Sequence, residues 1–141
     1  MQVKDIMSCS VISIAPEESA AVAARLLSRH NIGALPVCSP DGRLLGMIAD
    51  RDIVLRCVAA QKDPARTQVS TLMTRRVVRV QAEDSAESAA ACMAHEQVRR
   101  LPVTQDNRLV GFLSLSDFAN AACHVEVGAA FHEICQNLQR R

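Results

Sequence analysis

The stretch Ile32-Gly-Ala-Leu-Pro-Val37 returns later in the chain as Val98-Arg-Arg-Leu-Pro-Val103. Two more pairs of stretches keep the same order around it, Val3-Lys-Asp-Ile-Met-Ser8 with Val69-Ser-Thr-Leu-Met-Thr74 and Asp41-Gly-Arg-Leu-Leu-Gly46 with Asp106-Asn-Arg-Leu-Val-Gly111. Matching stretches in a fixed order indicate an internal repeat. The 141-residue chain is therefore interpreted as a duplicated unit followed by a tail.

Each copy of the repeat predicts the element order β-α-β-β-α, because a β-branched run, an Ala-rich stretch, a hairpin and a second helix start follow one another. These elements fall at 11–14, 19–29, 35–37, 44–48 and Asp50 in the first copy, and at 77–80, 85–95, 101–103, 109–113 and Ser116 in the second. One copy alone cannot cover its small sheet. We therefore expect an α+β (mixed α/β) fold in which two units pack by a pseudo-twofold axis, leaving two equivalent clefts that draw residues from both copies.

The expected domain boundaries follow the repeat. The first unit spans residues 1–60, a polar linker containing Pro64 spans 61–68, the second unit spans 69–122 and a helical tail spans 123–141. An apolar stripe at helical spacing in the tail predicts a helix that folds back on the module or packs against a second subunit. The stripe consists of Phe131, Ile134, Cys135 and Leu138.

Composition argues against several function classes. Sixteen Lys and Arg balance fifteen Asp and Glu, and only three aromatic residues are present, so neither a basic face nor a base-stacking surface for nucleic acid is expected. No apolar run approaches the ~18 residues of a membrane helix, and the N-terminus does not resemble a secretory signal. We expect a cytoplasmic protein with no nucleic-acid or membrane partner, whose six irregularly spaced cysteines stay reduced.

The sequence contains no recognisable catalytic motif. The four histidines form no Ser-His-acid order or H-E-x-x-H pattern, and no phosphate-binding G-x-x-x-x-G-K-[ST] loop occurs. We therefore expect no enzyme activity and no catalytic residue. A zinc site of Cys123, His124, His132 and Cys135 is conceivable on helical spacing, but it lacks the paired short spacings of structural zinc sites, so no metal is predicted.

The strand-to-helix turns Gly46–Asp52 and Gly111–Asp117 are the candidate sites. A carboxylate at a helix start can accept hydrogen bonds from both hydroxyls of a ribose, and a helix N-terminus can hold a phosphate. The simpler interpretation is that Ser114 and Asp117, like Asp50 and Asp52, cap the helices that follow them. Spacing by itself favours capping.

With these stretches and turns in the same order twice, the chain resembles a tandem pair of CBS domains, the units named for cystathionine β-synthase and also called a Bateman module. The resemblance covers residues 3–119 and is closest to a stand-alone protein of bacterial type. It implies a β-α-β-β-α fold for each copy and clefts that often take adenosine-containing ligands. It also implies a homodimer formed through the helices.

The resemblance further implies which residues face the ligand. In the favoured cleft, the base lies against Ile12, Ile32, Gly33 and Ala34, and the ribose and phosphate lie against Ser114, Ser116 and Asp117. In the second cleft, the base lies against Val78 and Val98, the ribose against Asp52, and Arg51 is a candidate phosphate contact. The second cleft has Ala49 where the family has Ser or Thr, and the lost hydroxyl ranks it second.

Arg99 and Arg100 are the other departure between the copies, since Gly33 and Ala34 stand at their places in the first copy. A guanidinium offers phosphate a planar fork of donors, so these two residues are the candidate phosphate ligands. The simpler interpretation is a solvated pair, or salt bridges to Glu83, Asp84 or Glu96.

Together these features predict a stand-alone regulatory module that binds an adenosyl ligand, namely AMP, ADP, ATP, NAD or S-adenosylmethionine. The module requires no cofactor and passes ligand occupancy through its homodimer to an unknown regulated protein. The alternative is a ligand-free module for dimerisation or protein interaction. The sequence identifies neither the ligand nor the regulated partner.

Overall fold

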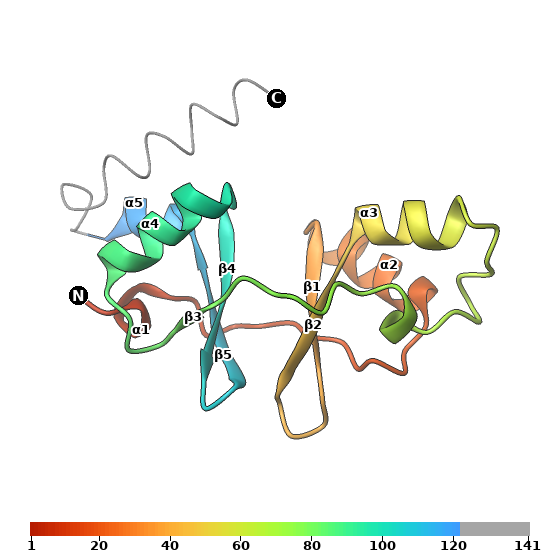
Figure 1. Ribbon diagram of the computed structural model, residues 1–141, viewed down its shortest axis with the longest axis horizontal. Coiled ribbons are helices and arrows are strands. Elements are labelled where there is room, and N and C mark those ends of the chain that lie inside the picture. The colour runs from red at the N-terminus through yellow and green to blue at the C-terminus, as the bar shows by residue number, and fades with distance from the viewer. Residues whose placement is uncertain (122–141) are drawn as a thin grey trace. The chain divides into compact units, whose positions relative to one another are not determined.

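The computed structural model describes residues 1–121, which form two compact units. Unit 1 contains Met1–Val11 and the chain from Val78 onward, and unit 2 contains Ile12–Val77. The predicted mixed α/β fold is confirmed, with helices and a small sheet in each unit (Figure 1). The compact units divide the chain differently from the predicted stretches 1–60 and 69–122, because the first segment of each copy pairs with strands of the other copy. The predicted helical tail lies outside the described residues.

Unit 2 is built on an antiparallel hairpin of β1 (Ala34–Cys38) and β2 (Leu44–Ala49). Helix α2 (Ala20–His30) precedes the hairpin, and α3 (Asp50–Ile53) follows it and continues into a π-helical turn, Val54–Val58. The hydroxyl of Ser19 accepts a hydrogen bond from the Val22 N–H and so caps α2. The predicted helix and hairpin of the first copy are thereby confirmed.

Unit 1 repeats this layout. Its sheet runs in the order β3 (Val80–Gln81), β4 (Arg100–Gln105) and β5 (Arg108–Ser114), with β3 parallel to β4 and β4 antiparallel to β5. Helix α4 (Ala86–Glu96) precedes the hairpin and α5 (Leu115–Asn120) follows it. Two short helical segments, α1 (Val3–Ile6) and the 3-10 turn Val69–Thr71, were not predicted, although both lie in repeated stretches.

The first strand of each copy is shorter than predicted, for a reason that lies in the next strand. Ile14 forms a single parallel bridge to Val37, donating to the Pro36 carbonyl and accepting from the Cys38 N–H. Extending this ladder to Ile12 would require an N–H at position 36, which proline lacks. Pro102 has the same place in β4, and β3 accordingly begins only at Val80. The two prolines are the third residues of their strands rather than the first.

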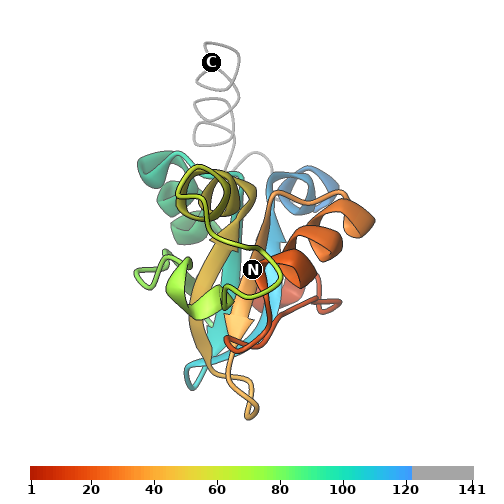
Figure 2. The ribbon, with the colours of Figure 1, turned by 90° about the vertical axis from the view of Figure 1, so that its right-hand side faces the viewer.

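The edge of each sheet is completed by a segment from the other copy of the repeat. We call these two segments, residues 3–8 in unit 1 and 69–74 in unit 2, the exchanged segments. Ser8 and Phe112 exchange two backbone hydrogen bonds of 2.8 and 2.9 Å at the edge of β5, and Thr74 and Met47 exchange two of 2.9 Å at the edge of β2. Figure 2 shows the green segment that contains Val69–Thr71 beside the hairpin of unit 2. The predicted linker 61–68 belongs to this same unit, because Ala20 and Ala21 donate to the carbonyls of Thr67 and Pro64.

Glycine permits this close approach of backbone to backbone. A Cβ atom at Gly46 would stand 2.7 Å from the Thr74 carbonyl oxygen, and one at Gly111 would stand 2.7 Å from the Ser8 carbonyl oxygen. Both distances are shorter than van der Waals contact, so only glycine fits at these positions. At both glycines, the backbone that approaches belongs to an exchanged segment.

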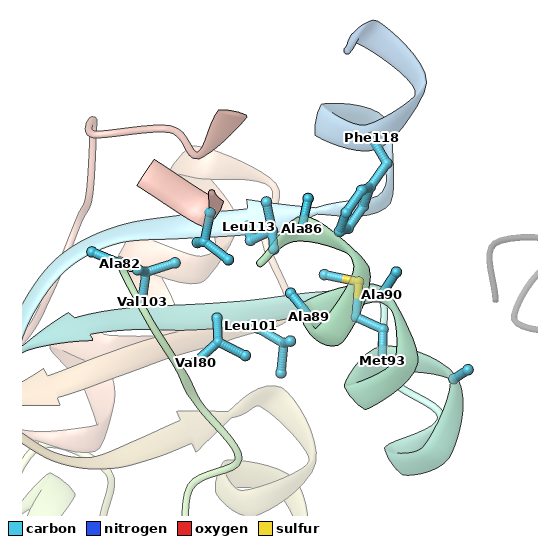
Figure 3. Packing of buried hydrophobic residues seen from close by; sticks show 12 residues of the cluster. Val80, Ala82, Ala86, Ala89, Ala90, Met93, Leu101, Val103, Leu113 and Phe118 are labelled. Atoms are coloured by element: carbon cyan, nitrogen blue, oxygen red, sulfur yellow. The ribbon is translucent and has the colours of Figure 1, made fainter. Parts of the chain in front are cut away.

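Each unit has its own hydrophobic core. In unit 1, the alanines of α4 bring the helix close to the sheet, and Met93 and Phe118 fill the space beside Leu101 and Leu113 (Figure 3). In unit 2, α2 and α3 pack on β1 and β2, and the core extends to the exchanged segment 69–74. Its members include Ala23, Leu27, Leu35, Val37, Ile48, Ile53, Cys57, Val69, Leu72 and Met73.

Gly46→Ala is expected to lower the free energy of unfolding by about 1–3 kcal/mol, because the new methyl group forces the segment around Thr74 away from β2. Chemical denaturation measures the loss. Gly33→Ala is the matched control, since a Cβ there meets only Asp50 Oδ2 at an ordinary 3.8 Å. Equal stability losses in both variants would contradict the packing argument.

Thr104 is a fully buried threonine in β4, and its hydroxyl has no hydrogen-bond partner among residues 1–121. Thr104→Val replaces this hydroxyl with a methyl group of similar shape, so we expect a gain in stability of about 1 kcal/mol. Thermal or urea unfolding measures the gain. Thr104→Ser, which keeps the hydroxyl and loses the methyl, should instead destabilise the protein. A loss of stability in Thr104→Val would show that the hydroxyl is satisfied.

Candidate functional site

The Asp117 turn, Ser114–Asp117, links β5 to α5. The Ser114 N–H donates to Asp117 Oδ2 at 2.7 Å, and the Ser114 hydroxyl donates to the same oxygen at 3.0 Å. The hydroxyls of Ser114 and Ser116 lie 2.8 Å apart. The backbone bond is half of a capping box, so the capping interpretation is confirmed for Asp117. Oδ1 of Asp117 takes no hydrogen bond from any residue that the structure describes, and the half-buried carboxylate can accept further donors there.

Arg99 and Arg100 adjoin this turn within unit 1. The Leu115 N–H donates to the Arg99 carbonyl at 3.1 Å, and Arg100 lies directly opposite Ser114 in the β4–β5 register. The Arg100 guanidinium lies 5.6 Å from the centroid of the Phe112 ring, a distance typical of a cation–π contact. Both arginines are exposed, and neither forms an ion pair within residues 1–121, so the predicted alternative of salt bridges to Glu83, Asp84 or Glu96 is wrong.

The Asp52 turn, Ala49–Asp52, is the equivalent turn of unit 2, but its carboxylate has different neighbours. Oδ2 of Asp52 accepts from the Ala49 N–H at 2.8 Å, which confirms capping here too. Oδ1 lies 3.9 Å from Arg56 Nε. Ala49 supplies no hydroxyl, and the side chain of Arg51 is exposed. The two carboxylates therefore share a backbone position and differ in their partners.

Two of the residues predicted to hold the base, Ile12 and Val78, carry backbone groups without partners in residues 1–121. Neither Ile12 nor Val78 has a backbone hydrogen bond in the described part of the chain, because Pro36 and Pro102 end the neighbouring ladders. Backbone N–H and C=O groups need partners, and these are free to pair with an amide-like edge such as that of adenine. Gly33 accepts from the Asp50 N–H at 2.9 Å through its carbonyl.

The structure divides the predicted site residues between the two units. Ile12, Ile32, Gly33, Ala34, Arg51 and Asp52 belong to unit 2, whereas Val78, Val98, Arg99, Arg100, Ser114, Ser116 and Asp117 belong to unit 1. Within unit 1, the hairpin register brings the arginines to the Asp117 turn. This proximity was not predicted. The signal that could have revealed it is the short turn at Asp106-Asn107, which fixes the register between β4 and β5. The assembly of complete clefts stays a prediction.

The cysteines within the described residues are free thiols. They are Cys9, Cys38, Cys57 and Cys92. Burial raises the pKa of the Cys38 thiol, opposed by a hydrogen bond with Ser13, and burial with the nearby carboxylates of Glu96 and Asp84 raises the pKa of Cys92. A raised pKa disfavours the nucleophilic thiolate, so neither thiol is activated for chemistry.

Within residues 1–121, no cluster of three His, Cys, Asp or Glu side chains could hold a metal ion. The zinc hypothesis of Cys123, His124, His132 and Cys135 falls outside that range, as does the apolar stripe of Phe131, Ile134 and Leu138. No helix in the described portion has the length and apolar character needed to cross a membrane.

Comparison with known proteins identifies the family. Residues 3–58 and 69–124 each match the CBS domain. The chain belongs to the CBS-domain family. This CBS-domain pair is 40% identical over 133 residues to the CBS domain-containing protein YhcV of Bacillus subtilis (strain 168), covering 94% of each chain. It is 39% identical over 116 residues to Hypoxic response protein 1 of Mycobacterium tuberculosis (strain ATCC 25618 / H37Rv), covering 82% of this chain and 81% of that protein.

Solved structures agree with this assignment. The crystal structure of Hypoxic Response Protein I with two coordinated zinc ions is 38% identical, with a TM-score of 0.76 over 84% of this chain and 97% of that one. The CBS domain pair of protein MJ0100, in complex with 5'-methylthioadenosine and S-adenosyl-L-methionine, is 30% identical, with a TM-score of 0.70 over the same shares. The predicted family and fold class are thereby confirmed for the CBS-domain pair.

Proposed function

We propose that this CBS-domain pair is a regulatory protein that binds an adenosyl ligand and does no chemistry on it. The observation that carries the proposal is the Asp117 turn, where a carboxylate oxygen without a partner in the described residues shares a turn with two hydroxyls, and where the backbone of the exposed Arg99 and Arg100 adjoins that turn. Vicinal ribose hydroxyls are donors that a carboxylate accepts. Arg99 and Arg100 suit a phosphate or a carboxylate of the same ligand.

The ligand class is supported by chemistry and by likeness. The unpaired backbone groups of Ile12 and Val78 suit the donor and acceptor edge of adenine. Protein MJ0100, a structural relative, is complexed with two adenosyl compounds. The proposed neighbours of the base include Ile32, Gly33, Ala34 and Val98. The candidate ligands are AMP, ADP, ATP, NAD and S-adenosylmethionine.

The output of the module is proposed to be a change in its homodimer. Ligand can act only through a difference in affinity between two shapes of the protein. Val54, Leu55 and Val58 form an exposed apolar group on the π-helical turn of unit 2, each at least half exposed, and such a group favours contact with another protein surface. The same observation supports the second candidate function, a ligand-free interaction module.

Asp117→Ala is expected to weaken adenosyl-ligand binding by about tenfold to a hundredfold, because hydrogen bonds to a charged group are lost. Isothermal titration with AMP, ADP, ATP, NAD and S-adenosylmethionine measures the change. Asp52→Ala is the matched control and should change the affinity far less, because its carboxylate is already engaged by Arg56.

Two results would count against this proposal. No heat and no shift in melting temperature at millimolar concentrations of all five compounds would reject adenosyl binding and favour the interaction module. A larger loss in Asp52→Ala than in Asp117→Ala would reject the ranking of the two turns. Circular dichroism of both variants checks that loss of the helix cap has not unfolded them.

A further inference from the structure

Asp52 has both carboxylate oxygens engaged within its own unit. Oδ2 accepts from the Ala49 N–H at 2.8 Å, and Oδ1 lies 3.9 Å from Nε of Arg56, one helical turn further along. The side chain of Asp52 is only 14% exposed, whereas that of Arg56 is 55% exposed. A ribose that approached Asp52 would therefore meet a guanidinium whose Nε lies 3.9 Å from the second oxygen.

Arg56 is held in place from its other side. Its Nη1 donates to the carbonyl oxygen of Leu72 at 3.0 Å. Leu72 is fully buried and lies in the exchanged segment that pairs with β2. The chain Asp52–Arg56–Leu72 thus ties α3 to the exchanged segment, and we call it the Arg56 staple.

The described residues of unit 1 contain no such staple. Arg56 comes four residues after Asp52, and the residue four positions after Asp117 is Ala121, which carries no charge. Ile6 is the residue that corresponds to Leu72 in the repeat. Its carbonyl accepts no hydrogen bond from an arginine among the described residues. The two turns therefore differ in a charged side chain, beyond the difference between Ala49 and Ser114.

We propose that Arg56 closes the Asp52 turn to ligand, so that this chain takes a single adenosyl ligand at the Asp117 turn. The inference rests on the proposed function and deepens it by assigning Asp52 to structure and Asp117 to binding. Arg56 acts in two ways: it neutralises the carboxylate that would accept the ribose hydroxyls, and it fills the position from which they would donate. Displacing it would also break its bond to the Leu72 carbonyl.

The binding experiment counts ligands per chain. Titration with S-adenosylmethionine and with AMP should give one site in the natural chain. The double variant Ala49→Ser with Arg56→Gln restores a hydroxyl and frees the carboxylate, so a second site should appear, at least about tenfold tighter than any residual second binding in the natural chain. Arg66→Gln is the matched control, because it removes the exposed Arg66–Asp63 pair of the same unit and should leave one site.

A second arm tests the staple without ligand. Arg56→Gln should speed hydrogen exchange of the amides of Leu72, Met73 and Thr74 by about fivefold, because the exchanged segment loses a side-chain tie. Arg66→Gln should not change these rates. Equal rates in the natural chain and Arg56→Gln would overturn the staple.

The outcomes of the two arms are distinguishable. One site in the double variant, or two equal sites in the natural chain, would overturn the inference while leaving adenosyl binding in place. Weaker binding in Arg56→Gln at the first site would also overturn it and would make Arg56 a ligand contact. Binding of neither probe by any variant would overturn the proposed function and this inference with it.

Discussion

Backbone hydrogen bonds between different copies of the repeat close each of this protein's two units, among them the pairs between Ser8 and Phe112 and between Thr74 and Met47. Each pair attaches a segment from one copy of the repeat to the hairpin of the other copy. The attachment depends on glycine, because any side chain at Gly46 or Gly111 would strike the backbone of the arriving segment. The core follows from the same contact, since Val3 and Val69 bring their segments into the two buried clusters.

On the opposite edge of each hairpin, a proline stops the parallel strand ladder. Pro36 and Pro102 lie inside their strands, buried, at the point where a parallel ladder would continue to Ile12 and Val78. Since proline has no N–H, the ladder stops, and the backbone groups of Ile12 and Val78 stay unpaired. The same residue type in both copies therefore ends a strand and exposes hydrogen-bonding groups. The family resemblance assigns the ligand's base to these positions.

Duplication gives two turns with one backbone geometry, and side chains then separate their roles. Both Asp52 and Asp117 accept the N–H at the start of their helix. Only the Asp117 turn adds hydroxyls from Ser114 and Ser116, and only Asp52 faces an arginine within the described residues. Capping uses one carboxylate oxygen in each unit, so it does not exclude the proposed binding at Asp117.

The repeat, the element order and the capping positions could be predicted from the sequence, because they depend on local patterns: Ser19 and Ser85 before Ala-rich runs, and short turns between β-branched stretches. The family could be recognised for the same reason. The exchange of segments could not be predicted, because a repeated stretch such as Val3–Ser8 shows what it resembles and not which hairpin it pairs with. The Arg56 staple was hidden likewise, since its partner Leu72 lies far from it along the chain. Local chemistry thus determined the elements and their caps, whereas pairing over long sequence distances, which depends on the packed fold, decided which segment closes each unit and which carboxylate has an arginine beside it.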